Sequence, residues 1–342
     1  MKHFRFSFIF TLVALACAGW WGYVNGGTLN AIEMIWIAAI LGVMEVSLSF
    51  DNAVVNAAVL KNWNYFWRTL FLTLGILIAV FGMRLLFPLV IVAFTANIDL
   101  LDVWNLALTN PEEYSSRLTA HHAEVSAFGS MFLLLVFLNF LLDEEKDIHW
   151  LGAIEEKLGS LGKVGSISIF ISLSVLMCAL SFVQDNKFDV LVAGIWGILV
   201  YVGVDLLGNL LSSENSEVDA SKVIKTGSIG GFLYLEVLDA SFSFDGVIGA
   251  FAISKDIVII MIGLGIGAMF VRSLTVYLVE KETLDEYIYI EHGAHYAIGV
   301  LAIIMLLTMK FHIPEAITGL IGISLIILSV LSSIKFNKSQ EA

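Results

Sequence analysis

The chain has 342 residues, of which 58% are hydrophobic and only 14% are charged. Because an average soluble domain is about one quarter charged, this composition excludes an ordinary soluble enzyme. The formal net charge of −13 argues against nucleic acid as the main partner, since phosphate binding needs a basic surface.

Apolar segments follow one another along most of the chain, and about ten of them are long enough to cross a bilayer. A membrane-spanning helix needs about 20 mostly apolar residues. In chain order the segments cover residues 6–24, 31–60, 66–95, 121–142, 165–184, 188–212, 228–254, 256–280, 291–310 and 314–334. The sequence therefore predicts an all-α protein, a polytopic transmembrane helix bundle of about ten spans.

The first segment allows two interpretations. Lys2 and Arg5 precede its apolar run, as in a signal peptide. We favour a first helix that is retained, because the internal repeat described below includes it. Cys17 and Cys178 both lie inside apolar segments and indicate no disulfide framework.

The charges between the segments indicate the topology. If both termini are cytoplasmic, twelve lysines and arginines lie on the inner side and four on the outer side. This bias predicts a multi-pass protein of the plasma or inner membrane with both termini in the cytoplasm. The longest outer loop, 96–120, is acidic, and we expect it to be a solvated loop or an electrostatic sink for cations. The mixed-charge loops 143–164 and 212–225 are expected to be cytoplasmic linkers.

Two segments share the pattern acid-x-Ser-x-Ser-Phe-Asp. They read Glu45-Val-Ser47-Leu-Ser49-Phe50-Asp51 and Asp239-Ala-Ser241-Phe-Ser243-Phe244-Asp245. An arginine and then a histidine follow each motif on later segments. The two copies lie five segments apart, so they run in opposite directions through the membrane. This arrangement predicts an inverted repeat of two five-helix halves, residues 1–186 and 187–342, as in many secondary transporters.

Acidic side chains within the motif segments are the candidate ligands of a cation. An ionised carboxylate at the bilayer centre costs at least about 3 kcal/mol, so these acids are either protonated or compensated by a bound cation. Acids six residues apart diverge on a straight helix, so they converge on one ion only if the helix is broken near Ser-Phe-Asp or if the two motif helices meet face to face. We favour two broken motif helices. Asn52 and Gly246 directly follow the two aspartates and tolerate such a break. The predicted metal ligands are Glu45, Asp51, Asn52, Glu236, Asp239 and Asp245.

Other polar residues of the apolar segments are possible accessory groups. The serines could add ligands or serve helix packing. The arginines could balance the acids when no ion is bound, or reach toward the interface. The histidines could relay protons, bind metal at a vestibule or lie at the interface without a ligand. The acid of the sixth segment is a functional candidate or lies near its cytoplasmic end. The accessory residues are Ser47, Ser49, Ser241, Ser243, Arg84, Arg272, His122, His292, His295 and Asp205.

The ligand chemistry narrows the class of ion. Carboxylate and carbonyl oxygens suit hard divalent ions such as Mn²⁺, Mg²⁺ or Ca²⁺. The absence of a nearby cysteine argues against Cu⁺ or a zinc thiolate site.

The motif residues resemble those of the TerC family of integral membrane proteins, which is named for tellurium resistance and grouped with the lysine-exporter superfamily. Glu45, Asp51 and Asn52 match its early motif. The later motif is matched by Glu236, Asp239, Phe242, Ser243 and Asp245. The resemblance covers about 31–142 and 228–310 and looks closest to a branch with extra helices and paired histidines. It implies Mn²⁺ efflux. The chain departs from the family at Gly246, where serine is frequent, and this departure bears on the choice of ion.

The sequence thus predicts a transporter with no enzymatic activity and no permanently bound cofactor. Its substrate is expected to be a divalent cation, Mn²⁺, exported in exchange for protons. Its expected surroundings are the lipid bilayer, and a homo-oligomer with further copies of the chain is one option. The alternatives are export of Ca²⁺ or a basic amino acid, and a membrane scaffold of a stress response whose acids bind a structural ion. An intramembrane hydrolase with paired aspartates is a weaker alternative.

Overall fold

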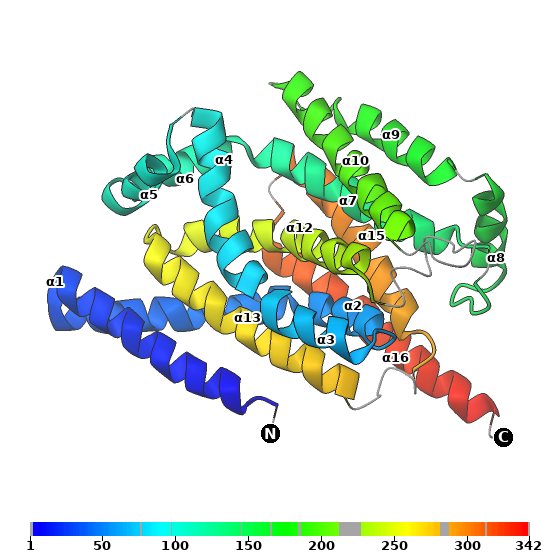
Figure 1. The fold of residues 1–342 in the computed structure, drawn as a ribbon, viewed down its shortest axis with the longest axis horizontal. Coiled ribbons are helices and arrows are strands. Elements are labelled where there is room, and N and C mark those ends of the chain that lie inside the picture. Colours follow the sequence, from blue (N-terminus) through cyan, green and yellow to red (C-terminus); the bar gives the residue numbers. More distant parts are fainter. Residues whose placement is uncertain are drawn as a thin grey trace. The chain divides into compact units, whose positions relative to one another are not determined.

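The computed structural model describes residues 3–75, 77–96, 98–144, 146–164, 166–183, 186–211, 227–280, 287–311 and 313–340 (Figure 1). Every regular element in these ranges is a helix. The α-helices are α1 (Arg5–Leu48), α2 (Phe50–Leu60), α3 (Tyr65–Leu70), α4 (Phe87–Ala96), α5 (Leu100–Thr109), α6 (Pro111–Ala120), α7 (His122–Leu141), α8 (Ala153–Gly159), α9 (Ile167–Ala179), α10 (Lys187–Leu211), α12 (Ile229–Ile253), α13 (Ile257–Glu280), α15 (Ile290–Thr308) and α16 (Glu315–Gln340). Two π-helical stretches, η1 (Phe71–Gly75) and η2 (Ile78–Leu86), join α3 to α4, and a short 3-10 turn, η3 (Ser160–Lys163), follows α8.

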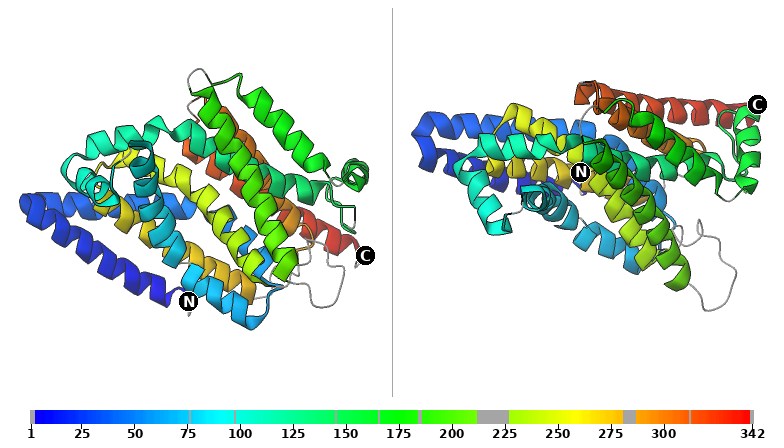
Figure 2. Two further views of the ribbon diagram at one scale, coloured as in Figure 1. Left: turned by 45° about the horizontal axis from the view of Figure 1, so that its top comes forward. Right: turned by 90° about the horizontal axis from the view of Figure 1, so that it is seen from above.

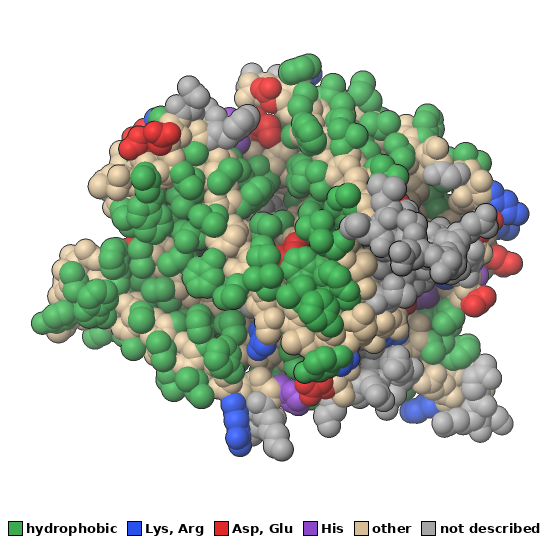
Figure 3. Space-filling model, in the orientation of Figure 1, with side chains coloured by type: hydrophobic (Ala, Val, Ile, Leu, Met, Phe, Trp, Pro, Cys, Tyr) green, Lys and Arg blue, Asp and Glu red, His purple; other side chains and the backbone are tan. Residues whose placement is uncertain are grey.

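Seven of the described helices are long and apolar enough to cross a membrane. The number rises to eight if α8 with η3 and α9, which bend by 101°, form one broken span. Hydrophobic side chains also predominate on the face shown in Figure 3. The predicted polytopic membrane bundle is therefore confirmed as a class, while the number of ten spans stays a prediction. The difference arises because α1 contains two of the expected segments, α9 has only 13 residues, and α12 carries three acids.

Close contacts divide the chain into two compact units. The first unit contains residues 1–53, 69–122 and 242–277, and the second contains 54–68, 123–241 and 278–342. Segments of the two units alternate along the sequence. The proposed division into halves 1–186 and 187–342 stays a prediction.

Helix α1 of the first unit folds back on itself (Figures 1 and 2). Its reversal lies at Gly27, whose φ of 77° and ψ of −163° belong to a region that essentially only glycine occupies. Beside the reversal, the Asn30 side chain donates a hydrogen bond of 3.0 Å to the Gly22 carbonyl. A side chain at Gly22 would meet the backbone of Ala31 at 2.8 Å, so the two arms are in close contact. The sequence predicted these arms as the separate segments 6–24 and 31–60.

The second arm of α1 packs closely against α13 through small residues. A Cβ atom added to Gly42 would lie 3.0 Å from the Ile266 side chain, and one added to Gly263 would lie 3.0 Å from the Ala38 carbonyl. Such small residues let two membrane helices approach closely. This packing positions Glu45, whose side-chain carbons lie directly over Gly267 of α13.

The acidic stretch 96–120, expected to be a solvated loop, forms the two helices α5 and α6 instead. Asn110 and Pro111 explain the start of α6, because the Asn110 side chain accepts a hydrogen bond from the Glu113 amide at 3.4 Å and proline suits the first helical position. The expectation of a loop was therefore wrong, although the Asn110-Pro111 dipeptide in the sequence is a signal for the start of a helix.

In the second unit, the spanning helices α7 and α15 are both buried along most of their length. Helix α15 lies against α7, because a side chain at Gly299 would meet the Phe137 ring at 2.6 Å. On another side α15 packs on α16, where Gly293 faces Ser329. The start of α15 is tied to α16 by a hydrogen bond of 2.9 Å from the Tyr289 amide to the Ser333 hydroxyl.

The reversal of α1 yields a direct test. Replacing Gly27 by alanine places a Cβ in a backbone region that costs about 1–3 kcal/mol, so Gly27→Ala is expected to lower the unfolding temperature in detergent. The matched control is Gly203→Ala in α10, where a Cβ meets nothing within 4 Å. The control is expected to be neutral or slightly stabilising, since alanine is the better helix former. Equal effects of the two substitutions would contradict this account of the reversal.

Candidate cation site

The first motif lies at a break between two helices. α1 ends at Leu48, α2 begins at Phe50, and Ser49 between them has a φ of −101° and a ψ of 17°. The break predicted for this motif is therefore confirmed. Asp51 lies in the first turn of α2, where a carboxylate is favoured by the helix dipole, and it accepts a hydrogen bond of 2.9 Å from the Asn52 amide.

The second motif lies within one uninterrupted helix, α12, and the break predicted there was wrong. Gly246 permits a break but does not require one, since a glycine inside a helix costs only about 1 kcal/mol. Its small size has another use in the structure. A Cβ at Gly246 would lie 3.1 Å from Oε2 of Glu45, so glycine leaves room for that carboxylate.

Glu45 is the centre of the polar contacts in the first unit. Its side chain is 1% exposed and forms an ion pair with Arg84. The Ser49 hydroxyl donates a hydrogen bond of 2.8 Å to Oε1 of Glu45. Of the two interpretations of Arg84, a counter-charge or a position toward the interface, the ion pair favours the counter-charge. An ionised carboxylate in these apolar helices is compensated by a guanidinium.

Arg84 approaches Glu45 from a π-helical segment. One guanidinium nitrogen donates a hydrogen bond of 2.7 Å to the Ala79 carbonyl within η2. π-Helical turns are rare and occur frequently at functional sites. The equivalent Arg272 on α13 instead donates from Nε to the Leu72 carbonyl in η1, at 2.8 Å. The two arginines at matching positions in the motif order therefore have different partners.

The remaining predicted ligands are distributed over both units. Asp51 and Asn52 are buried in the first unit, while Glu236 and Asp239 are buried one turn apart on α12 in the second. Neither carboxylate oxygen of Glu236 has a hydrogen-bond partner among the described residues. The side chain of Asp245 lies outside the described part of the structure.

The accessory serines separate into two groups. The hydroxyls of Ser47 and Ser241 donate to carbonyls of their own helices, at Val43 and Val237, each at 2.9 Å. Ser49 contacts Glu45, and the Ser243 hydroxyl is buried without a hydrogen-bond partner in the described part of the chain. His122 is the first residue of α7, and Asp205 lies within α10.

Among the side chains that the structure describes, no three from histidine, cysteine, aspartate and glutamate gather closely enough to hold a metal ion. The two groups of acids belong to different units, and one of the six predicted ligands is not described. Their convergence on one ion stays a prediction.

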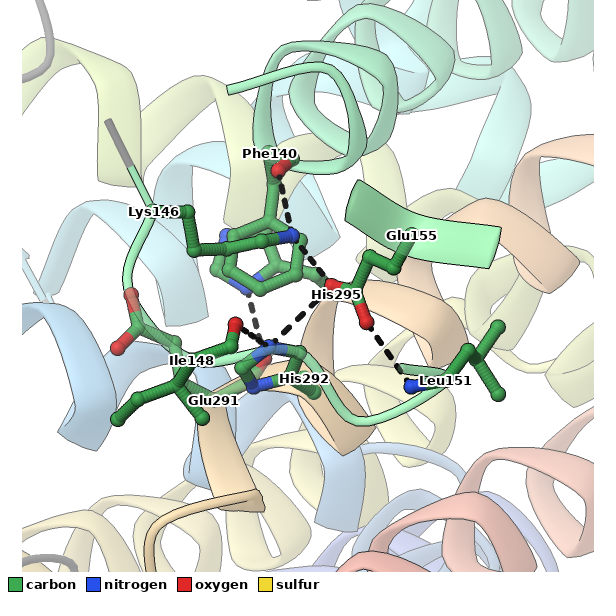
Figure 4. Close-up of polar contacts among 8 residues, drawn as sticks. All are labelled: Phe140, Lys146, Ile148, Leu151, Glu155, Glu291, His292 and His295. Atoms are coloured by element: carbon green, nitrogen blue, oxygen red, sulfur yellow. Dashed lines mark hydrogen bonds and ion pairs between the residues drawn. The ribbon is translucent and has the colours of Figure 1, made fainter. Parts of the chain in front are cut away.

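A second buried polar network lies in the second unit, where the loop after α7 meets the start of α15 (Figure 4). Glu155 of α8 forms an ion pair with Lys146 and accepts a hydrogen bond of 3.1 Å from the Leu151 amide. His292 places Nε2 at 2.8 Å from the Ile148 carbonyl and at 3.3 Å from Glu155. Because a carbonyl only accepts, Nε2 of His292 carries a proton and is unsuited to hold a metal ion.

Aromatic contacts complete this network. The Phe140 ring stacks on His295 with a centroid distance of 3.9 Å, and Lys146 lies 4.2 Å from the centre of the Phe140 ring. Nδ1 of His295 lies 2.8 Å from the Glu291 carbonyl. Sequence reasoning assigned Lys146 and Glu155 to a linker. Their partner His292 is far away in the sequence, and no periodic pattern connects them.

Opposing effects act on the carboxyl group of Glu155, which lies on α8 outside the seven spans. Burial by itself would raise its pKa. The hydrogen bonds from Lys146 and from the Leu151 amide, together with the positive charge of Lys146, outweigh burial and hold the pKa of Glu155 below its usual value of 4.5.

Removing one partner of the buried ion pair in the first unit is expected to destabilise the fold. Arg84→Met leaves an unpaired carboxylate in an apolar setting and should lower the free energy of unfolding by about 3–5 kcal/mol. Adding Glu45→Gln should restore much of the loss, since the uncompensated charge is then gone. Unfolding in detergent, followed by circular dichroism, measures both. Arg272→Met serves as the control. It removes only a hydrogen bond to a carbonyl and should lower the free energy of unfolding by less. A double variant as unstable as Arg84→Met would contradict the pairing.

The network around Glu155 is expected to be pH-dependent. A carboxyl group whose pKa is lower in the folded state than in the unfolded state stabilises the fold at pH values above its unfolded-state pKa. This stabilisation is lost as the pH falls through its folded-state pKa. The difference in unfolding temperature between wild type and Glu155→Gln should therefore be largest near neutral pH and shrink below about pH 4.5. A difference that is unchanged or grows on acidification would show that Glu155 is not held as a carboxylate.

Comparison with known proteins relates the chain to one family. A family model described as "Protein of unknown function (DUF475)" matches residues 50–340, which include Asp51, Arg84 and the acids of α12, whereas Glu45 precedes the match. Searches of curated proteins and of solved structures find no match. Because the model covers most of the 342 residues, the chain belongs to the DUF475 family.

Proposed function

We propose that this protein exports a divalent cation, Mn²⁺, across the membrane in exchange for protons. The observation that carries the proposal is the ion pair between Glu45 and Arg84 at the break before α2. Charged side chains within membrane helices are costly and typically mark ion pathways or proton relays. Broken helices are typical of the binding sites of secondary transporters.

In this mechanism Arg84 takes the place of the cation when the transporter is empty. An arriving Mn²⁺ would coordinate the Glu45 carboxylate together with the oxygens of Asp51 and Asn52, and the guanidinium would withdraw. Glu236, Asp239 and Asp245 of α12 remain predicted ligands of the exported ion. The π-helical winding of η2 supports such a movement, because a π-turn and a regular α-helical turn place the following residues differently.

Protons would replace the ion when it leaves. A group of acids in apolar helices cannot remain fully ionised without a cation, so release of Mn²⁺ favours protonation of some of them. This exchange couples export to proton entry. The inverted repeat, the cytoplasmic position of both termini and the resemblance to the TerC family are parts of the same proposal.

Oxygen ligands alone favour hard divalent ions, and the described site offers carboxylate, amide and hydroxyl oxygens. The choice of Mn²⁺ among these ions comes from the resemblance to TerC.

Transport by purified protein in liposomes tests the proposal. Wild type is expected to move Mn²⁺ when a pH gradient is imposed, with a matching proton flux reported by a pH-sensitive dye. Asp51→Asn and Asp245→Asn should reduce the Mn²⁺ flux by at least about tenfold, since even outer-shell partners of metal ligands are worth 10–100-fold. Asp189→Asn on exposed Asp189 of α10 is the matched control and should transport normally.

Parallel assays with Ca²⁺ and a basic amino acid distinguish the substrates. Transport of one of these in place of Mn²⁺ would overturn the choice of ion. Equal Mn²⁺ flux in all variants would overturn the assignment of the site. Mn²⁺ binding without flux would favour the scaffold and contradict transport.

A further inference from the structure

A groove in the second unit lies between α9 and α15, both labelled in Figure 1. It has a volume of about 380 Å³, within the usual range of ligand pockets, and it is open along one side. Its walls are apolar side chains that include Phe170, Cys178 and Phe182 on one side and Ile303 and Leu306 on the other.

The polar groups of the groove wall are turned away from it or only weakly polar. The Ser174 hydroxyl donates a hydrogen bond of 2.8 Å to the Phe170 carbonyl of its own helix. The outward side chains of α9 are also apolar, and Phe170 and Met177 are 68% and 61% exposed. In a membrane protein such a surface is in contact with lipid hydrocarbon.

A positive charge lies at one end of this groove. Lys310 lies two residues beyond the end of α15, and its Nζ is 5.6 Å from the centre of the Phe182 ring, which belongs to the groove wall. Lys310 is exposed. Since α15 has 19 residues and is about 28 Å long, close to the thickness of the hydrocarbon layer, the residue after its end lies at the level of the lipid headgroups.

We propose that the groove binds one acyl chain of an anionic phospholipid, with Lys310 holding the phosphate. The groove is long enough for one acyl chain, because the 13-residue α9 that forms its wall is about 20 Å long and one leaflet contributes about 15 Å of hydrocarbon. The charges also agree, since the apolar groove accommodates a chain and its charged end selects a negative headgroup. This inference is independent of the proposed transport function.

Native mass spectrometry of the full-length protein tests the site. The protein is purified with mixed phosphatidylglycerol and phosphatidylcholine, and the retained lipids are counted after graded detergent removal. Wild type should retain one phosphatidylglycerol about fivefold more often than phosphatidylcholine, the ratio equivalent to the ~1 kcal/mol of one lysine near an anionic surface. Lys310→Gln should abolish this preference. Cys178→Phe, which fills the groove and leaves Lys310 intact, should reduce retention of both lipids.

Lys255→Gln is the matched control, because it removes the same charge at a residue of the first unit, where the Lys255 side chain lies 3.5 Å from the Ser115 hydroxyl. It should keep the wild-type preference. The unfolding temperature of every variant is measured in detergent, so a variant that fails to fold is recognised and replaced by Lys310→Met or Ile303→Trp. Equal retention of the two lipids by wild type, or an equal loss with Lys255→Gln, would overturn the proposal.

Discussion

A carboxylate surrounded by apolar helices requires a positive partner, and the structure of the first unit is arranged around this requirement. Glu45 is paired with Arg84, and the neighbouring residues leave room for the ion pair. Gly246 and Gly267 leave space for the glutamate side chain, and Ser49 supplies a hydrogen bond at the break between α1 and α2. A larger residue at either glycine would meet the glutamate before it met anything else.

The same requirement bears on the cation exchange that we propose for this site. A buried ion pair contributes little net stability, because desolvation of both charges opposes their attraction. Because the net contribution of such a pair is small, exchanging the guanidinium for another cation would change the free energy only modestly. The proposed Mn²⁺ would use the same carboxylate that Arg84 pairs with in this structure.

Part of this arrangement could be predicted from the sequence, and part of it could not. Long apolar segments indicated the spanning helices, and the break at Ser49 followed from the six-residue spacing of Glu45 and Asp51. The place of Arg84 after the motif fits either a counter-charge or a residue near the interface, and only the packing pairs it with Glu45. The same spacing of Asp239 and Asp245 predicted a second break, which was wrong, because Gly246 leaves room for Glu45 and does not form a turn.

Contacts between residues far apart in the sequence could not be predicted from sequence patterns. The contact between Glu155 and His292 joins the short helix α8 to the spanning helix α15. No periodic pattern in the sequence indicates that these two residues are partners. The reversal of α1 also depends on a single backbone conformation at Gly27, which composition alone does not reveal. Local signals determine helices well, whereas the choice of partner for a buried charge depends on packing.

The most direct test of the central claim is an anomalous difference map from crystals of the protein grown with and without Mn²⁺. The account predicts a Mn²⁺ peak within coordination distance of the Glu45 and Asp51 carboxylates, with the Arg84 guanidinium withdrawn from Glu45. It also predicts that the ion pair is retained when no Mn²⁺ is present. A Mn²⁺ peak elsewhere with the Glu45–Arg84 pair intact, or no peak at all at saturating Mn²⁺, would contradict it.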